Sequence, residues 1–284
     1  MKRLTVLGAS GFLGRALLGA ARSRHFEVRA VTRGHRADFG PDVEVSVVAD
    51  YLSIPAPRDS QESLVHLAES NLVGGSHDAA AALRVVDAAA DRGYAYLCYA
   101  SSAAVYGDRS DVPHRASGTA VPAGDYGRSK LQCEARVRAA GGGAARLTNL
   151  IGPGQSRASV LTRILEQIPG RGPLRLRSLA PVRDFCWVTD AADAIVAACE
   201  AGLQGAFNVG AGESVSIGEL ARRALDVAGE GARAVEAEET AEAAASMLRV
   251  DISETAAACG WSPATSLSRA LEILVSERLA GVQR

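Results

Sequence analysis

Short apolar runs alternate with amphipathic stretches through the first half of the chain. The apolar runs predict strands at residues 4–7, 27–31, 43–48, 63–67, 95–100 and 146–150. The stretches between them predict helices at 11–23, 79–92 and 126–140, the last of which stops at the glycine triplet 141–143. This alternation is typical of a parallel sheet with helices on both faces. We therefore expect an α/β fold built on a doubly wound parallel sheet.

The periodic pattern weakens after residue 150. Glycine, proline and arginine crowd residues 152–177, which predicts loops and short elements, whereas 191–200, 217–227 and 267–278 predict helices. We expect residues 1–150 to form one domain and 151–284 mainly a smaller lobe. A segment of about 185–202 is expected to return from the lobe to the first domain.

Composition and charge restrict the class of protein. The 284 residues are 48% hydrophobic and 22% charged, which indicates a globular chain, and the net charge of -1 without like-charged runs disfavours a nucleic-acid partner. No apolar stretch reaches the roughly 18 residues of a membrane span, and Gly8 interrupts the apolar start, so we expect neither membrane insertion nor export. The five scattered cysteines show no metal-ligand spacing, so we expect no metal and a reducing cytoplasm.

Three glycines follow the first predicted strand with the spacing of a dinucleotide-binding turn. Gly8 permits a tight turn, Gly11 lets the backbone approach a pyrophosphate, and Gly14 lets the helix pack closely on the sheet. The pyrophosphate would lie at the helix N-terminus, beside Phe12 and Leu13, where free N–H groups attract anions. The position after a strand and before a helix predicts that residues 1–150 form a dinucleotide-binding Rossmann domain.

The ends of the next two strands bear on which dinucleotide is bound. An NAD site usually places Asp or Glu at the end of the second strand, but this chain has Thr32 and Arg33, with Arg36 following. A hydroxyl and a guanidinium suit a 2′-phosphate, so NADP(H) is favoured and NAD(H) remains an alternative. Asp50, at the end of the third strand, is expected to hydrogen-bond the adenine amino group.

The end of the fourth strand carries three residues of interest. The backbone of Leu67 and Ala68 is expected to line the nicotinamide side of the cofactor. A lone histidine at a strand end has no visible partner, so we interpret His66 as structural.

A tyrosine and a lysine are separated by one helical turn in the stretch GDYGRSK. A lysine cation about 4 Å from a phenol interacts with it by about 4 kcal/mol at an effective dielectric of 20, which favours the phenolate. Tyr126 beside Lys130 would then donate or accept a proton near neutral pH, as carbonyl–alcohol interconversion requires. The hydroxyl of Ser102, or of Ser101 if the alignment shifts, is expected to hold the substrate oxygen beside the phenol.

Together these motifs resemble the extended short-chain dehydrogenase/reductase family, in its nucleotide-sugar epimerase, dehydratase and 4-ketoreductase branch. The resemblance covers nearly the whole chain. It rests on the glycine turn, HLA at 66–68, ASSAAVYG at 100–107, the Tyr126–Lys130 pair, RLTNLIGPG at 146–154, RDF at 183–185, FNVGAG at 207–212 and GWSP at 260–263.

The resemblance implies the roles of several residues. It makes Ser102, Tyr126 and Lys130 the catalytic set, with Tyr126 and Lys130 also contacting the cofactor. Asn149 and Arg183 would contact the substrate's nucleotide diphosphate in a substrate-binding lobe, although an ion pair with the adjacent aspartate is an alternative for Arg183. The chain departs from the family at Asp78, where asparagine is usual, and in its shorter loop at 70–77 and shorter segment between Asn149 and Arg183.

The resemblance leaves several reactions open. We expect an NADPH-dependent reductase that converts an NDP-4-keto-6-deoxysugar at C4, with an NAD-dependent NDP-sugar 4-epimerase as the main alternative. A ketoreductase of a non-sugar natural product and a cofactor-binding sensor are the others. The resemblance also implies a homodimer formed through the helices near 79–92 and 126–140.

Overall fold

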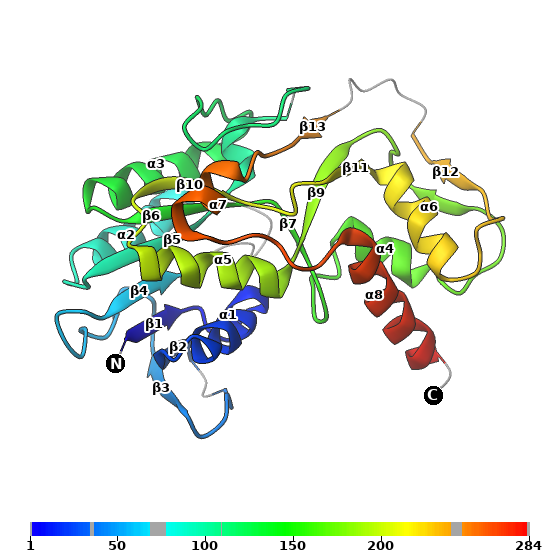
Figure 1. Cartoon of the computed structure of the whole chain (residues 1–284). Helices are drawn as coiled ribbons and strands as arrows, with labels where there is room; N and C mark the ends of the chain where they lie inside the picture. Colours follow the sequence, from blue (N-terminus) through cyan, green and yellow to red (C-terminus); the bar gives the residue numbers. More distant parts are fainter. Residues whose placement is uncertain (1, 35–36, 69–77, 109, 240–245, 283–284) are drawn as a thin grey trace.

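A computed structural model of the chain describes residues 2–34, 37–68, 78–108, 110–239 and 246–282. It consists of a large α/β part and a smaller lobe, which lie side by side (Figure 1). Within the described residues, no helix is long and apolar enough to cross a membrane. None of the five cysteines, all of which lie in described parts of the chain, is joined in a disulfide, and four of them are buried.

The large part is built on a parallel sheet of seven strands, and it confirms the predicted fold class. The strand order is β10-β6-β5-β4-β1-β2-β3, and every neighbouring pair is parallel. The strands are β1 (Arg3–Leu7), β2 (Glu27–Arg33), β3 (Val43–Val48), β4 (Ser63–His66), β5 (Tyr96–Ser102), β6 (Gly143–Leu147) and β10 (Gly205–Val209).

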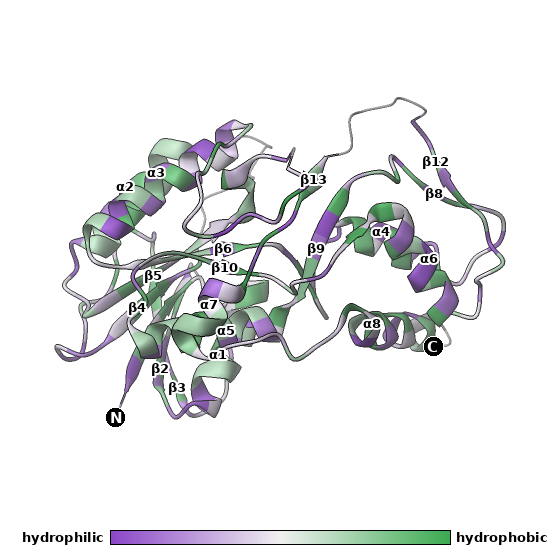
Figure 2. Ribbon diagram, turned by 45° about the horizontal axis from the view of Figure 1, so that its top comes forward, coloured by the Kyte–Doolittle hydropathy of each residue, from purple (hydrophilic) through white to green (hydrophobic). Residues whose placement is uncertain are grey.

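Helices cover both faces of this sheet. On one face α1 (Phe12–Ser23) packs against α5 (Val188–Ala201), and on the other α2 (Ala79–Ala90) packs against α3 (Asp125–Ala139). In Figure 2 the central strands are mostly green, whereas purple residues interrupt α2 and α3 on the outside. The sheet is therefore apolar on both sides, as parallel sheets are.

The smaller lobe has its own apolar core. Its centre is β9 (Val182–Trp187), which pairs with β7 (Asn149–Ile151), β11 (Ser214–Ser216) and β13 (Met247–Leu248). Around it lie α4 (Val160–Glu166), α6 (Ile217–Val227) and α8 (Leu267–Val282), with a small sheet of β8 (Leu174–Leu176) and β12 (Val235–Ala237). Buried residues such as Leu161, Ile164, Leu220 and Leu271 fill the core.

The chain passes repeatedly between the two parts. The lobe strand β9 runs directly into α5 of the large part, and β10 then adds the edge strand beside β6. Helix α7 (Ser253–Cys259) returns later to pack on α5 and β10. The division into domains at residues 150 and 151 remains a proposal. Helix α5 and strand β10 come after that point in the chain but pack on the large sheet.

The prediction of a single strand at residues 146–150 is wrong, because the end of β6 and the start of β7 both lie in that region. The chain leaves the large sheet at Thr148, whose N–H donates to the carbonyl of Val209, and Asn149 begins the pairing with β9. This switch between sheets places neighbouring residues of one segment in the two parts of the molecule.

Candidate active site

The glycine turn after β1 has the geometry expected of an anion-binding helix start. Gly8 has φ +86°, and a Cβ there would lie 2.9 Å from the backbone nitrogen of Ala68. A Cβ on Gly14 would lie 2.4 Å from the carbonyl oxygen of Gly8, so only glycine allows α1 to approach the turn this closely. Gly11 caps α1 without a side-chain hydrogen bond, which leaves its first N–H groups for a ligand.

A cavity of about 280 Å³ brings the glycine turn and the expected catalytic residues together. It lies at the carboxyl ends of the parallel strands, where such sheets bind their ligands. Its lining includes Gly8, Gly11, Phe12, Leu13, Gly14, Leu67, Ser102, Tyr126 and Lys130.

Tyr126 and Lys130 occupy the first turns of α3. Tyr126 is 39% exposed, whereas Lys130 is only 3% exposed. The Lys130 ammonium group donates to the carbonyl of Ala100 at 2.6 Å and lies 4.7 Å from the centre of the Tyr99 ring. Its Nζ atom is 5.7 Å from the centre of the Tyr126 ring. The buried ammonium group is therefore held at a fixed place beside the exposed phenol.

The two adjacent serines at the end of β5 have different environments. The Ser102 hydroxyl accepts from the N–H of Ala104 at 3.2 Å and donates to none of the residues that the structure describes, so its proton can serve a ligand in the cavity. Ser101 also lines the cavity, but it is only 3% exposed and its hydroxyl already donates to the carboxylate of Glu134. This difference supports Ser102 over Ser101 as the substrate-binding serine.

A buried ion pair beneath these serines was missed by sequence reasoning. Glu134 lies one turn after Lys130 on α3, and its carboxylate receives two N–H groups of Arg146 from β6, the shortest bond being 2.7 Å. Arg146 also donates to the hydroxyl of Tyr106 at 2.9 Å. The Glu134–Arg146 pair thus ties α3 to β5 and β6 directly behind the cavity. The one-turn spacing from Lys130 was the available signal.

His66 is buried beside this group of residues. Its ring is 2% exposed and meets the Tyr99 ring edge-on, with centres 5.4 Å apart. Burial, and then the positive charge of Lys130, lower the pKa of His66 to about 3. Among the described residues, its Nδ1 has no hydrogen-bond partner. The ring is therefore neutral at physiological pH, in keeping with a structural role.

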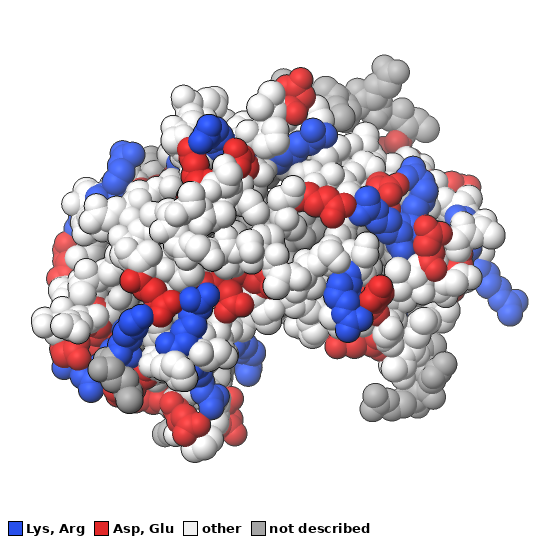
Figure 3. Space-filling model, viewed as in Figure 1, with Lys and Arg blue, Asp and Glu red and all other residues white. Residues whose placement is uncertain are grey.

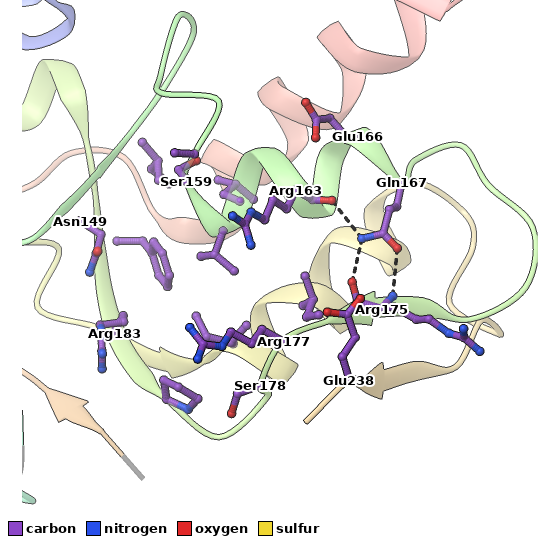
Figure 4. A pocket seen from close by; sticks show the side chains of 18 of the residues that line it. Asn149, Ser159, Arg163, Glu166, Gln167, Arg175, Arg177, Ser178, Arg183 and Glu238 are labelled. Carbon is purple, nitrogen blue, oxygen red and sulfur yellow. Dashed lines mark hydrogen bonds between the residues drawn. The ribbon is translucent and has the colours of Figure 1, made fainter. Parts of the chain in front are cut away.

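A second, larger cavity of about 750 Å³ lies in the lobe (Figure 4). Asn149 and Arg183 both line it, as expected of substrate-binding residues. Leu150 lines both cavities, so the two adjoin at the start of β7. The Asn149 amide donates to the carbonyl of Asp184 at 3.1 Å. The wall of the lobe cavity at Leu150 therefore also borders the smaller cavity, which Tyr126 lines.

Comparison with known proteins decides the family. A sequence model of the NAD dependent epimerase/dehydratase family matches residues 4–210. The chain belongs to this family. Members of the epimerase/dehydratase family are NAD(P)-dependent enzymes, and the resemblance seen in the motifs is confirmed.

Individual epimerase/dehydratase relatives differ in their reactions. The chain is 26% identical over 301 residues to a dTDP-6-deoxy-L-talose 4-dehydrogenase (NAD(P)(+)) of Kitasatospora kifunensis, covering 96% of this chain and 94% of that protein. It is also 26% identical over 265 residues to a UDP-glucose 4-epimerase of Corynebacterium glutamicum, covering 80% of each. The structure of RMD from Pseudomonas aeruginosa complexed with NADPH superposes with a TM-score of 0.79 at 23% identity, covering 99% of this chain and 100% of that one, which shows the shared fold.

The residues expected at the cofactor's adenosine end do not line the smaller cavity. The structure gives no support to the expected contact between Thr32 and a 2′-phosphate. Thr32 is fully buried, so its hydroxyl is not accessible to a 2′-phosphate, and that contact would fall to Arg33. Arg33 is the last residue of β2, and its guanidinium lies 5.5 Å from the centre of the Tyr51 ring. Arg36 and the shorter loop at 70–77 lie outside the described residues.

Two acidic residues considered in the sequence analysis accept hydrogen bonds from backbone N–H groups that follow them closely in the chain. Asp50 lies two residues beyond β3, not within it, and its Oδ1 accepts from the N–H groups of Leu52 and Ser53. Asp78 is the N-cap of α2, where its carboxylate accepts from the N–H of Ala81 at 2.9 Å. The contact expected between Asp50 and adenine remains a proposal.

Arg183 is held in its own network. Its guanidinium donates to the carbonyls of Val182 and Ser246, each at 2.8 Å, and to the Ser246 hydroxyl at 2.6 Å. That hydroxyl in turn donates to Asp108 at 2.9 Å. The structure thus gives no support to the alternative of an ion pair with Asp184, which faces another way.

Asp184 is buried in a different hydrogen-bond network. Its carboxylate accepts from the Thr148 hydroxyl and from the N–H groups of Ala211 and Gly212, all within 2.9 Å. Burial nevertheless raises the pKa of Asp184 to about 6. Asp184 therefore links the loop after β10 to Thr148, the residue at which the chain passes from one sheet to the other.

Proposed function

We propose that this enzyme reduces an NDP-4-keto-6-deoxysugar at C4 with NADPH. The observation that carries the proposal is that two neighbouring cavities share Leu150 in their walls. One is lined by Ser102, Tyr126 and Lys130, and the other by Asn149. A nucleotide held in the lobe would present its sugar to the proton donors. The relative named as a dTDP-6-deoxy-L-talose 4-dehydrogenase supports this substrate class and this position of attack.

The residues present fit a nicotinamide dinucleotide. The glycine turn opens onto the free N–H groups of α1, which suit a pyrophosphate, and Leu67 lines the same cavity as Tyr126. When bound there, the cofactor supplies the hydride for the carbonyl carbon.

The chain's own residues handle the oxygen and its proton. The Ser102 hydroxyl donates a hydrogen bond to the substrate carbonyl oxygen, and Tyr126 transfers its phenolic proton to that oxygen as the C–O bond becomes a single bond. The buried Lys130 cation stabilises the phenolate that remains. The exposed fraction of Tyr126 then allows water to return the proton.

The test is reduction of dTDP-4-keto-6-deoxyglucose followed by loss of NADPH absorbance. Tyr126→Phe removes the proton donor, so kcat should fall at least about 100-fold while the Kd for NADPH stays within about twofold. Tyr94→Phe is the matched control, because the Tyr94 hydroxyl donates to the carbonyl of Pro55 and lines neither cavity. Full turnover by Tyr126→Phe would refute the mechanism.

A second candidate is an NAD-dependent NDP-sugar 4-epimerase, which the relative named as a UDP-glucose 4-epimerase supports. Such an enzyme would retain its cofactor and show no net consumption of NADPH. Purified protein that carries bound NAD and interconverts two NDP-sugars would select this reaction over the reductase.

The preference for NADPH rests on Arg33. Its guanidinium is at the end of β2, and no carboxylate occupies the adjacent position, which is the buried Thr32. The test is fluorescence titration with NADPH and NADH, and tighter binding of NADH would overturn the preference.

A homodimer through α2 and α3 is also proposed, from the family resemblance. The helices are bridged on their surface by Arg136, which donates to Asp87 at 2.8 Å and to Asp91. The interface would therefore be polar. A monomeric mass by light scattering at micromolar concentration would refute the dimer.

We propose that the enzyme is cytoplasmic, because none of its five cysteines, each in a described part of the chain, is joined in a disulfide. Titration of unfolded protein, purified without reductant, should find all five thiols. Recovery of only three would indicate a disulfide and contradict the assignment.

A further inference from the structure

We infer that Glu134 and Arg146 act together as positioning residues for Ser102. The pair lies behind the smaller cavity, and neither of its side chains is among the residues that line that cavity. Any effect of the pair on the reaction is therefore exerted through the residues that it holds. The inference rests on the proposed function, in which the Ser102 hydroxyl binds the carbonyl oxygen of the substrate.

The proposed reaction needs groups from two separate elements to meet at one oxygen atom. Ser102 is the last residue of β5, whereas Tyr126 is in the first turn of α3. A displacement of either element by about 1 Å would take one of the two hydroxyls out of hydrogen-bond range. The contacts that fix β5 against α3 therefore decide whether both hydroxyls reach the same atom.

Helix α3 holds two consecutive residues of β5 directly before Ser102. Lys130 donates to the carbonyl of Ala100 at 2.6 Å, and one helical turn later Glu134 accepts from the hydroxyl of Ser101. A glutamate side chain is long and has many rotamers, so this second contact has a fixed direction only if the carboxylate is itself held.

Arg146 holds this carboxylate from the neighbouring strand. It lies opposite Ser101 in the register of β5 and β6. Its Nε donates to both carboxylate oxygens of Glu134, at 3.0 and 3.2 Å, and one terminal nitrogen donates at 2.7 Å. Because the guanidinium is planar and rigid, these bonds fix the orientation of the carboxylate.

The environment of the pair strengthens it. On the face of the molecule seen in Figure 3, blue and red side chains lie side by side at the surface, where water weakens their attraction. The side chains of Glu134 and Arg146 are each only 7% exposed. Their hydrogen bonds are therefore shielded from competition with water.

The same guanidinium also holds the chain on the other side of Ser102. The second terminal nitrogen of Arg146 donates to the hydroxyl of Tyr106 at 2.9 Å. Tyr106 ends η1 (Ala103–Tyr106), the short helix whose N-cap is Ser102. Ser102 thus lies between two residues that are both connected to Arg146, namely Ser101 through the carboxylate and Tyr106 directly.

Cavities border this chain of hydrogen bonds at both ends, so packing alone does not fix it. Ser101 lines the smaller active-site cavity, whereas Glu134 and Arg146 line a third cavity of about 250 Å³. The other charged side chain in the lining of the third cavity is Arg138, which is exposed. The hydrogen bonds from Ser101 through Glu134 to Arg146 therefore connect the linings of two cavities.

The test is a double-mutant cycle on kcat. Glu134→Gln should lower kcat about tenfold when Ser102 is present and less than about twofold in a Ser102→Ala background, because the hydroxyl that it positions is then absent. The Kd for NADPH should stay within about twofold. The cycle is measured on the reaction that the protein catalyses, whether reduction or 4-epimerisation. A general weakening of the fold would instead lower kcat by the same factor in both backgrounds.

Glu62→Gln is the matched control. Glu62 is also a fully buried carboxylate, and it pairs with Arg29 at 3.0 Å. It directly precedes β4, so it lies at the opposite end of the sheet from the active site. Both variants leave a buried arginine without its carboxylate and should lower the urea midpoint of unfolding. Only Glu134→Gln should lower kcat.

Hydrogen exchange at Ala104 gives a second readout that needs no substrate. The N–H of Ala104 donates to the Ser102 hydroxyl, so its exchange rate reports how firmly this bond is held. Glu134→Gln should raise that rate about tenfold, and Glu62→Gln less than about twofold. If Glu134→Gln does not fold, Arg146→Lys takes its place, because it keeps the charges paired but loses the planar fork.

The outcomes separate this inference from the proposed reaction. An equal loss of kcat in both backgrounds, or in Glu134→Gln and Glu62→Gln alike, would overturn the positioning role. Faster exchange at Ala104 in Glu134→Gln alone, in a protein that turns over no nucleotide sugar, would refute the proposed reaction and support the positioning role. Reduction of the ketosugar with kcat and the Ala104 exchange rate both unchanged in Glu134→Gln would do the reverse.

Discussion

Replacing His66 with glutamine should make the folded protein less sensitive to acid. The His66 ring is buried, and burial together with the charge of Lys130 lowers its pKa to about 3 from the usual 6.5. The unfolded chain therefore binds a proton at His66 between these two pH values, and the folded chain does not. The contribution of the neutral His66 ring to the free energy of unfolding is fully present above pH 6.5 and is lost as the pH falls toward 3.

The size of the effect follows from the two pKa values. Lowering the pH from 7 to 5 should destabilise the wild type by about 2 kcal/mol through His66 alone, with a slope approaching about 1.4 kcal/mol for each pH unit. His66→Gln is neutral at every pH and removes this contribution. Since only slopes are compared, any constant cost of the substitution cancels.

Urea unfolding at pH 5, 6 and 7 measures these slopes. The wild type should lose about 2 kcal/mol more than His66→Gln over this range. His25→Asn controls for the loss of one histidine, because His25 is exposed and has φ 62°, which asparagine tolerates. Equal slopes for the wild type and His66→Gln would show that the buried ring is not the source of acid sensitivity.

Three further predictions address the cofactor, the serines and the buried ion pair. Arg33→Ala should weaken NADPH at least about tenfold and leave NADH unchanged, measured by fluorescence titration; equal loss for both would remove Arg33 from the 2′-phosphate site. Ser102→Ala should lower kcat about 100-fold. Ser101→Ala should reduce kcat less and lower the free energy of unfolding by about 1 kcal/mol. A larger loss of kcat in Ser101→Ala than in Ser102→Ala would exchange the roles of the two serines. Glu134→Gln should destabilise the fold by about 3 kcal/mol in urea unfolding, because it leaves the buried charge of Arg146 uncompensated, and a loss under about 1 kcal/mol would contradict that account.

Local patterns predicted the parts of the site that lie close together in sequence. The turn at Gly8 requires a positive φ, which glycine adopts without strain, and the strand before it and helix after it are visible as apolar periodicity. Tyr126 and Lys130 lie one helical turn apart, so their proximity follows from helix geometry alone.

The rest of the site depends on contacts between distant segments. The pair of Glu134 and Arg146 joins a helix to a strand, and no local rule identifies that partner. The burial of Thr32 could not be predicted for another reason. A parallel strand that is covered on both faces has no alternation of polar and apolar residues, so its sequence does not show which side chains are buried. Strand β9 was missed because Arg183 and Asp184 interrupt its apolar run.

The passage of β9 directly into α5 has a consequence for synthesis on the ribosome. A nascent chain that ends at residue 187 contains α1 and six of the seven strands, but it lacks α5 and β10, whose residues Ile195 and Phe207 belong to the core around α1. Apolar surface on that face of the sheet stays uncovered until the first segments of the substrate lobe, from β7 to β9, have been made, and such surface favours aggregation of a nascent chain. The cofactor half of this enzyme therefore completes its folding only after the segments that line the substrate cavity have begun to emerge.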